Sequence, residues 1–266
     1  MYNKYLIVAS KQDKAGVNIT TALSQYEGFF FHLVDGEILH KNNLDDTRIQ
    51  AFDFIIFASK HKSEKGDKSL SVHAPGNWKG ADLGGEPGKV CSTSAQFQKQ
   101  LFNNLIKSAK ESKLEEKYAI TLECTHHGPL INKPCIFIEI GSTEFEWNDH
   151  NAAFAVARAI KETIETFKED KYNEVAIGLG GPHYCPSFNE LQEKSNYAIS
   201  HVIPQYITPI TEEMIKEAVE KTEEEVDLAI VDWKGLGNAE QRDAVLAILD
   251  KLYIRYKRTS EAKKEY

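Results

Sequence analysis

Short apolar runs alternate along this sequence with longer stretches in which apolar residues recur every three or four positions. Apolar runs of strand length that are rich in β-branched side chains are typical of strands covered on both faces of a sheet. Such runs predict strands at 5–9, 52–58, 118–124, 135–140, 174–179, 198–203 and 228–232.

The periodic stretches predict helices, several of which begin at a residue that can cap an N-terminus. The apolar stripe that follows Asp149, for example, continues with helical spacing to Phe167. The predicted helices cover 18–26, 95–113, 149–167, 211–225 and 238–252. The segment 69–88 is rich in glycine and proline and predicts a long loop. A loop of that length inside a compact domain is usually functional.

The order of these elements favours one architecture. Strands that alternate with helices predict an α/β fold with three layers, αβα, around a mainly parallel or mixed sheet. The 266 residues suffice for one large domain and contain no internal repeat, low-complexity tract or evident linker. We therefore expect a single catalytic α/β domain over 1–266.

Composition narrows the class of protein. Hydrophobic residues make up 41% and charged residues 27% of the chain, which argues against wholesale disorder. No apolar run approaches the roughly 20 residues of a membrane helix, and no secretory signal pattern precedes the first strand. The four cysteines form no C-x-x-C pair, which disfavours a zinc knuckle or a redox dithiol. These features predict a cytoplasmic protein with reduced cysteines.

The formal net charge of −8 argues against a protein that coats nucleic acid indiscriminately. It is compatible with one folded RNA that binds a local basic patch. Lysines gather at 60–68 and, with arginines, in the C-terminal segment 251–264. Each segment is interpreted either as a phosphate-binding patch or as a solvated surface, and the sequence does not decide between them.

Several predicted strands run directly into loops with reactive side chains. Histidines follow three of the strands within a few positions, namely His61, the pair His126 and His127, and His183. Ligands of open α/β sheets bind at the carboxyl ends of parallel strands. We therefore expect these loops to meet in one pocket.

One spacing conflicts with that expectation. Only ten residues separate the strands expected at 118–124 and 135–140, and so short a connection normally means an antiparallel hairpin. The histidine pair would then lie at the opposite edge of the sheet. Ten extended residues span roughly 33 Å, so a crossover loop that returns along the sheet is the alternative.

Five histidines lie in or beside these loops: His61, His73, His126, His127 and His183. Imidazole and carboxylate ligands suit Zn²⁺, which lowers the pKa of bound water to about 7. No H-E-x-x-H or other fixed-spacing motif is present, so a metal site rests on clustering alone. The alternatives are a general base without a metal and a purely structural role for individual histidines.

Several common chemistries are disfavoured. No P-loop and no G-x-G-x-x-G after the first strand are present, which argues against nucleotide hydrolysis and dinucleotide redox chemistry. A G-x-S-x-G nucleophile elbow is also absent. Gly141-Ser142-Thr143 precedes a helical segment, where backbone amides can bind an anion. The alternative for these three residues is an ordinary turn and cap.

Four segments together carry a family resemblance: Ser71-Val72-His73-Ala74-Pro75-Gly76-Asn77-Trp78, Glu123-Cys124-Thr125-His126-His127-Gly128-Pro129, Glu139-Ile140-Gly141-Ser142-Thr143-Glu144 and Gly178-Leu179-Gly180-Gly181-Pro182-His183-Tyr184. Because these four segments occur together and in this order, the chain resembles the archaeal and plant type of D-aminoacyl-tRNA deacylase over nearly its whole length. The resemblance implies hydrolysis of the ester between a D-amino acid and the terminal ribose of tRNA. It also implies a zinc requirement, a monomer and a fold like that of phosphorylases and peptidyl-tRNA hydrolases, with crossover loops.

The roles of single side chains are assigned from their chemistry. We expect catalysis by His126, His127, His183 and Glu144. We expect metal ligands among His73, His126, His183 and Glu139. The expected contacts with the substrate come from Lys60, Lys62, Trp78, Lys89, Gly141, Ser142, Thr143, Gly180, Gly181 and Tyr184.

These contacts divide by chemistry. The lysines would hold acceptor-stem phosphates, and Trp78 or Tyr184 would stack on the terminal adenine. Backbone amides at 180–181 or 141–142 would stabilise the oxyanion. Two other classes of function stay open: a metal-dependent amidohydrolase or peptidase on a related fold, and a non-catalytic tRNA-binding module.

Overall fold

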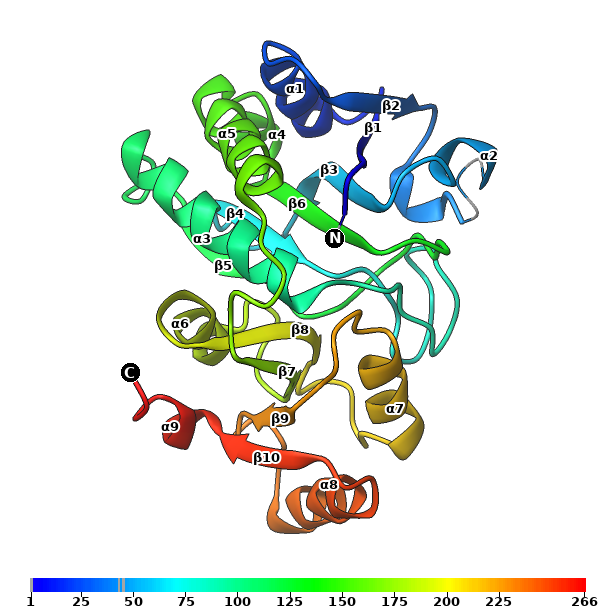
Figure 1. Cartoon of the computed structure of the whole chain (residues 1–266), viewed down its shortest axis with the longest axis vertical. Helices are drawn as coiled ribbons and strands as arrows, with labels where there is room; N and C mark the ends of the chain where they lie inside the picture. The colour runs from blue at the N-terminus through cyan, green and yellow to red at the C-terminus, as the bar shows by residue number, and fades with distance from the viewer. Residues whose placement is uncertain (1, 43, 45) are drawn as a thin grey trace.

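The computed structural model describes residues 2–42, 44 and 46–266, and the strands in this part of the chain form two sheets (Figure 1). The larger sheet has six strands in the order β2-β1-β3-β6-β4-β5. These are β1 (Tyr5–Ser10), β2 (Phe30–Val34), β3 (Phe54–Lys62), β4 (Ser69–His73), β5 (Ala119–Leu122) and β6 (Cys135–Ser142). The smaller sheet, in the order β10-β9-β7-β8, consists of β7 (Glu174–Leu179), β8 (Tyr197–Ile203), β9 (Leu228–Val231) and β10 (Arg255–Arg258).

Strand direction divides the larger sheet into two parts. β1, β2, β3 and β6 are parallel to one another, whereas β4 and β5 are parallel to each other and antiparallel to β6. The pairings of the smaller sheet are all parallel across the described residues. The α/β class with a mainly parallel or mixed arrangement is therefore confirmed, with the strands divided between two sheets.

Helices pack on both sides of this framework. One face of the larger sheet is covered by α1 (Lys14–Leu23), α3 (Ala95–Glu111) and α5 (His150–Thr166) (Figure 1). Its other face carries η1 (Ile38–His40), α2 (Asp46–Ile49) and loops, and α4 (Glu144–Trp147) follows β6. The smaller sheet lies between α7 (Glu212–Glu220) and α8 (Ala239–Lys251) on one side and α3, α6 (Pro186–Lys194) and α9 (Thr259–Ala262) on the other. Within the described residues, no helix combines the length and apolar character needed to cross a membrane.

Most elements expected from the hydrophobic pattern are present, and capping residues set where the helices begin. Ser94 caps α3 by accepting a hydrogen bond from the amide of Phe97. Asp149 caps α5 and Thr211 caps α7 in the same way, through side-chain oxygens that bind amides of the first turn. Without such a cap, the first amides of a helix have no acceptor within the helix.

Some boundaries differ from the sequence prediction. The expected long loop begins as strand β4, because Ser69–His73 is buried and pairs with both β5 and β6. Helix α1 starts earlier than 18, since Asp13 accepts a hydrogen bond from the Gly16 amide and caps it there. The sequence also missed β2, α6 and β10. Edge strands such as β10, with the sequence RYKR, lack the apolar pattern on which the prediction relied.

β5 and β6 are antiparallel in direction but do not form a hairpin. β4 lies between them and pairs with both. The connection therefore has to pass over one strand, a step of about 10 Å at the usual strand spacing. Residues 123–134 span that step easily, and they bring the histidine pair to the end of the sheet opposite the carboxyl ends of β3 and β6.

Candidate active site

Alternation along three strands of the larger sheet places polar side chains on one face. His61 is four positions after Phe57 in β3, so both side chains point away from α1, α3 and α5. Glu139 of β6 and His73 of β4 lie on the same face, where His73 stacks on Phe137 with ring centroids 5.3 Å apart. His61, His73 and Glu139 are buried. Buried polar groups need partners, and in this cluster the Glu139 carboxylate lies between the two imidazoles.

Glu139 lies midway between two histidines whose strands run in opposite directions. Gly141 pairs with His61 of β3, and Phe137 pairs with His73 of β4. Glu139 Oε2 is 3.6 Å from His61 Nδ1 and 3.5 Å from His73 Nε2. The sequence predicts a site at the carboxyl ends of parallel strands. His61 does lie near the carboxyl end of β3, whereas Glu139 and His73 lie on the face of the sheet, where strands that enter from both ends overlap.

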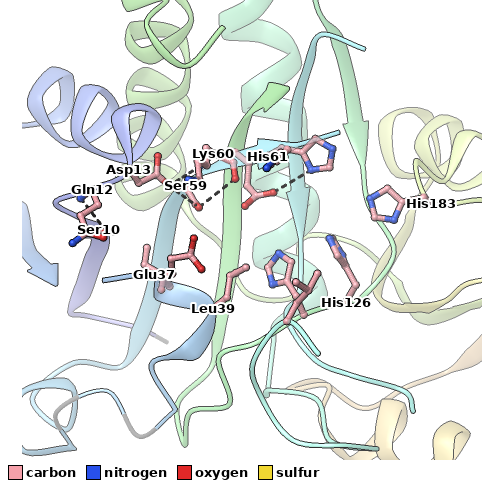
Figure 2. Close-up of a pocket in the computed structure, with 15 residues that line it drawn as sticks. Ser10, Gln12, Asp13, Glu37, Leu39, Ser59, Lys60, His61, His126 and His183 are labelled. Atoms are coloured by element: carbon pink, nitrogen blue, oxygen red, sulfur yellow. Dashed lines mark hydrogen bonds and ion pairs between the residues drawn. The ribbon is translucent and has the colours of Figure 1, made fainter. Parts of the chain in front are cut away.

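A second buried carboxylate, Glu123, follows the last residue of β5. Its Oε1 lies 3.2 Å from His61 Nδ1, and its Oε2 lies 3.1 Å from His183 Nε2 and 3.4 Å from His126 Nε2. His183 belongs to the loop after β7, so the smaller sheet contributes to the same cluster. Figure 2 shows His61, His126 and His183 around one hollow.

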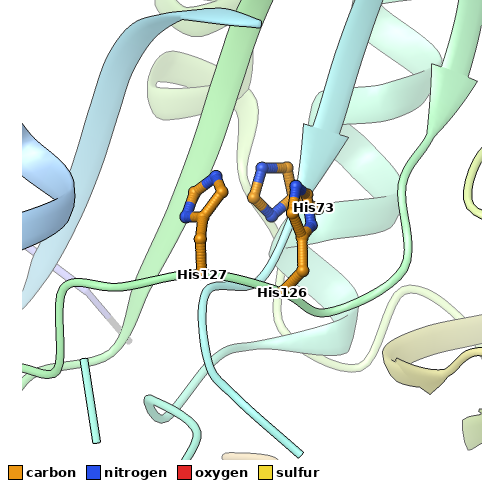
Figure 3. A group of neighbouring side chains, drawn as sticks. All are labelled: His73, His126 and His127. Atoms are coloured by element: carbon orange, nitrogen blue, oxygen red, sulfur yellow. The ribbon is translucent and has the colours of Figure 1, made fainter. Parts of the chain in front are cut away.

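His73, His126 and His127 form a compact group of rings (Figure 3). The ring centroid of His126 lies 4.3 Å from that of His73 and 4.3 Å from that of His127. In each of the three, Nδ1 binds a backbone carbonyl, at 3.2, 2.8 and 2.7 Å for His73, His126 and His127. Because a carbonyl oxygen only accepts, each Nδ1 carries the hydrogen. In a neutral imidazole, Nε2 then keeps its lone pair.

Electrostatics keep two of these rings neutral. Burial lowers the pKa of His126 well below its ordinary value, and the neighbouring His127 and His73 lower it further. Burial and His73 lower the pKa of His127 to about 4. A neutral imidazole can bind a metal or accept a proton, so His126 and His127 are available for either.

His61 and His183 are shifted in the opposite direction. Burial alone lowers both pKa values, but hydrogen bonds to Glu123 and Glu139 raise the pKa of His61 to about 11. Contacts with Cys124 and Glu123 outweigh burial and raise the pKa of His183 to about 10. Burial raises the pKa of each carboxyl, yet the histidines hold the pKa of Glu123 and of Glu139 below the ordinary value. The cluster thus balances two carboxylates with two charged imidazoles.

A hollow of about 590 Å³ opens beside this cluster (Figure 2). That volume lies in the range of small-molecule sites. Segments far apart in the sequence form its walls, and the lining residues are Ser10, Gln12, Asp13, Glu37, Ile38, Leu39, Ser59, Lys60, His61, Lys62, Leu83, His126, His127, Glu139 and His183. The imidazoles therefore face a space that can hold a substrate.

The structure brings together most of the histidines and acids singled out in the sequence, but not all. His73, His126, His127, His183 and Glu139 share the cluster. Glu144, expected to be catalytic, is not part of it. Its side chain is 67% exposed and pairs with Lys14, because β6 ends at Ser142 and Glu144 begins α4 on the surface.

Two expected substrate contacts also lie elsewhere. Trp78 is 4% exposed and packs in the core of the smaller sheet, which leaves little of its ring for a base to stack on. Lys89 pairs with Glu217, with 3.0 Å between Nζ and Oε2, and does not line the hollow. Lys60 does line it, and its Nζ lies 5.3 Å from the centre of the Trp147 ring.

Two of the backbone amides expected to bind an anion already have an acceptor. The amide of Gly180 donates to Ile203 O at 2.8 Å, so it is not available to an oxyanion. The amide of Thr143 donates to the carboxylate of Glu146 at 3.1 Å, as part of the capping box of α4. Gly141 and Ser142 belong to the ladder of β6. Of the alternatives for 141–143, the turn and cap describes what the structure contains.

Two central residues had no role in the sequence-based assignment. The sequence pattern places His61 among the loop histidines and Glu123 in the segment 123–129. It assigns neither residue a catalytic or metal-binding role. A usable signal existed for Glu123, since it is a carboxylate directly after a strand and three residues before His126. His61 lies inside β3 rather than in a loop, because β3 extends to Lys62.

Fold and site together define an α/β enzyme with a buried histidine–carboxylate centre. The sequence model of the family described as D-aminoacyl-tRNA deacylase matches residues 48–257. The chain is 34% identical to the D-aminoacyl-tRNA deacylase of Methanocaldococcus jannaschii, over 90% of this chain and 93% of that protein. It is 32% identical to the D-aminoacyl-tRNA deacylase of Methanococcus vannielii, over 96% and 99%. The chain belongs to the D-aminoacyl-tRNA deacylase family.

A solved structure shows the same fold. It is the crystal structure of a conserved protein of unknown function, which is 30% identical to this chain and superposes with a TM-score of 0.89. The match covers 99% of this chain and 98% of the other. The family resemblance that the four sequence segments carried is therefore confirmed, and the two other classes of function are not favoured.

Proposed function

We propose that this chain hydrolyses the ester bond between a D-amino acid and the terminal ribose of tRNA, which releases the amino acid and free tRNA. The observation that carries the proposal is the grouping of His73, His126 and His127, whose ligand atoms lie within 4.8 Å of one another, beside two buried carboxylates. His126 and His127 also line the hollow. Such a group can activate water next to a carbonyl. Membership of the family supports the substrate class.

The donor atoms of the cluster fit a zinc ion. His73 Nε2, Glu123 Oε1 and Glu139 Oε2 are buried and lack a hydrogen-bond partner within the described residues. The ligand atoms of this group lie within 4.8 Å of one another, and so do those of His73, His126 and His127. The lone pair of His73 Nε2 lies 3.5 Å from Glu139 Oε2, and two lone pairs that face each other in a buried site are unfavourable unless a cation lies between them. Imidazole nitrogen and carboxylate oxygen are ligands that zinc prefers.

In this proposal, His73, His126 and His127 would hold zinc together with Glu139, and Glu123 would be left to act on a proton. His127 thus replaces His183 in the set of metal ligands expected from the sequence. A bound zinc ion lowers the pKa of water to about 7 and so supplies a nucleophile at neutral pH. The Nδ1–carbonyl hydrogen bonds fix the three rings with Nε2 toward the ion, as outer hydrogen bonds do in metal sites.

The other residues of the cluster position and move protons. Glu123 takes the proton of the attacking water, because its carboxylate lies among the histidines of the cluster, 3.4 Å from His126 Nε2. His183 Nε2 donates to Glu123 at 3.1 Å and can pass a proton to the leaving ribose oxygen. His61 is held by Glu123 and by the Tyr184 hydroxyl, 2.9 Å from its Nε2. Because these residues come from both sheets, the two sheets form one catalytic unit in this proposal.

The test is a deacylation assay on tRNA charged with the D or the L form of the same amino acid, with and without a chelator. We expect rapid, chelator-sensitive hydrolysis of the D-aminoacyl-tRNA. His126→Ala and His183→Ala should abolish it while the circular dichroism spectrum stays that of the native protein. Near-full activity in both variants, or equal rates for an ester and a peptide substrate, would contradict the proposal.

A further inference from the structure

A second, larger hollow adjoins the histidine cluster on its other side. Its volume is about 1070 Å³, and it runs over the loop 62–68, the start of β5 and the loop after β7. His61, Lys62 and His183 line both this groove and the hollow of the active site. The two spaces therefore meet at the imidazoles, and a substrate that lies across them places its middle at the cluster.

The charges of this groove differ from those of the chain as a whole. The net charge of the chain is −8, yet Lys62, Lys65, Lys68 and Lys117 line the groove together with two acids. Within the described residues, neither Lys62 nor Lys65 forms an ion pair, and both are exposed. Clustered lysines with free ammonium groups are typical of phosphate contacts.

The other basic segment of the sequence is different. Lysines of the C-terminal segment are paired with acids: Lys257 lies 2.9 Å from Glu265, and Lys251 lies 2.6 Å from Glu212. Lys263 pairs with Glu190 as well. In the groove, Lys68 and Lys117 are paired as well, with Glu146 and Asp149. Lys62 and Lys65 are what distinguish the groove, because both are exposed beside the active site and lack an acidic partner among the described residues.

The first hollow has a different lining. Its apolar part is formed by Ile38, Leu39 and Leu83, beside the exposed carboxylate of Glu37. Asp13 and Glu139 also line it but already contact Ser59 and His61, and Lys60 and Lys62 flank His61 in the same wall. An aminoacyl group, with its ammonium and its side chain, fits Glu37 and the apolar residues.

We propose that the terminal nucleotides of the tRNA lie in the groove at 62–68 and that the aminoacyl group enters the hollow on the other side of the histidines. This inference rests on the proposed function. Lys62 and Lys65 contact backbone phosphates, and Glu37 faces the ammonium group at the other end of the substrate. The ester lies between these two ends, at Glu123 and His183. Tyr184 lines the groove with its hydroxyl held by His61, and its ring offers a surface on which a base stacks.

The experiment compares two double variants that remove the same charge. Lys62→Ala/Lys65→Ala alters the groove, and Lys171→Ala/Lys264→Ala removes two exposed lysines outside it. Each is assayed with D-aminoacyl-tRNA over a range of salt concentrations and with the same D-amino acid esterified to adenosine, which carries no phosphate. Melting temperatures confirm that both fold.

We expect the groove variant to raise KM for tRNA by about 10-fold or more and to flatten the slope of log(kcat/KM) against log[salt] by about 1.4, two single-strand contacts at about 0.7 each. Its kcat/KM for the adenosine ester should equal that of the wild type, and the control variant should match the wild type on both substrates. An unchanged KM and salt slope for tRNA, or an equal loss on the adenosine ester, would overturn the inference.

Either result leaves the proposed function intact, because the wild type still hydrolyses D-aminoacyl-tRNA. If the wild type does not hydrolyse it, the proposed function fails and the inference fails with it.

Discussion

His183 and Glu123 follow strands of different sheets, yet His183 Nε2 donates a hydrogen bond to Glu123 Oε2 over 3.1 Å. The same oxygen lies 3.4 Å from His126 Nε2. Glu123 is thus the point at which the loop of the smaller sheet meets the histidines of the larger one. Neither sheet alone brings these residues together, and the proposed mechanism gives Glu123 the central role.

The central role of Glu123 can be tested against Glu144. Glu123→Gln replaces a charged acceptor by an amide that cannot accept the proton of water, so we expect kcat for D-aminoacyl-tRNA to fall by about 100-fold or more. Glu144→Gln changes an exposed residue that pairs with Lys14, and its kcat should stay within about 2-fold of the wild type, as usual for surface positions. Single-turnover deacylation measures both. A larger loss of kcat in Glu144→Gln than in Glu123→Gln would contradict this prediction and support a catalytic role for Glu144.

The metal can be tested without an activity assay. We expect purified protein to contain zinc by mass spectrometry, and chelation to remove the zinc and lower the melting temperature, because ligand binding stabilises the folded state. His73→Ala and His126→Ala should each lower the zinc content. His150→Ala, an exposed histidine outside the cluster, is the control and should retain it. Full zinc content in both cluster variants would refute the ligand assignment.

A glycine in the loop after β4 supports the wall of the first hollow. Gly84 has φ +76°, and a Cβ there would lie 1.7 Å from the carbonyl oxygen of Leu39, which lines the hollow. Gly84→Ala should lower the free energy of unfolding by about 1–3 kcal/mol and raise KM, because Leu39 must move. Gly80→Ala is the matched control, since a Cβ there meets nothing within 4 Å. Urea denaturation measures both, and equal midpoints would contradict the prediction.

Lys99 makes the stability of the fold depend on pH. It is buried in α3, where its Nζ donates to backbone carbonyls of Leu191 and Gln192 at 3.3 and 2.5 Å. Burial lowers the pKa of Lys99 to about 7, whereas an unfolded lysine titrates near about 10.4. Between these values the unfolded chain binds more protons than the folded one. The contribution of Lys99 to the free energy of unfolding therefore rises with pH, by up to about 1.4 kcal/mol per pH unit.

Lys99→Met removes this dependence but keeps the volume of the side chain. The free energy of unfolding of the wild type relative to the variant should therefore increase from pH 7 to pH 9, and it should level off below about pH 7, where both states of the wild type are protonated. Urea denaturation at a series of pH values measures the difference. A difference that stays constant over pH 7–9 would show that Lys99 is charged in the folded protein.

The class of fold and the family could be predicted from local sequence patterns. Apolar runs such as Phe54–Ala58 and helical stripes such as that of α5 are local patterns, and burial on one or both faces follows from them directly. Capping residues such as Ser94 also act within a single turn. The motifs around His73, His126 and His183 sufficed for the family, because they depend on the order of residues and not on their positions in space.

Tertiary structure alone decided how these residues meet. The direction of β4 and β5 depends on pairing between segments about 50 residues apart, so the sequence could not show that His73 and His61 approach Glu139 from opposite ends. Glu144 and Glu139 are five residues apart, but the end of β6 sends one to the surface and leaves the other buried. Long-range pairing sets which charges are buried together, and burial sets their pKa values; local sequence contains neither.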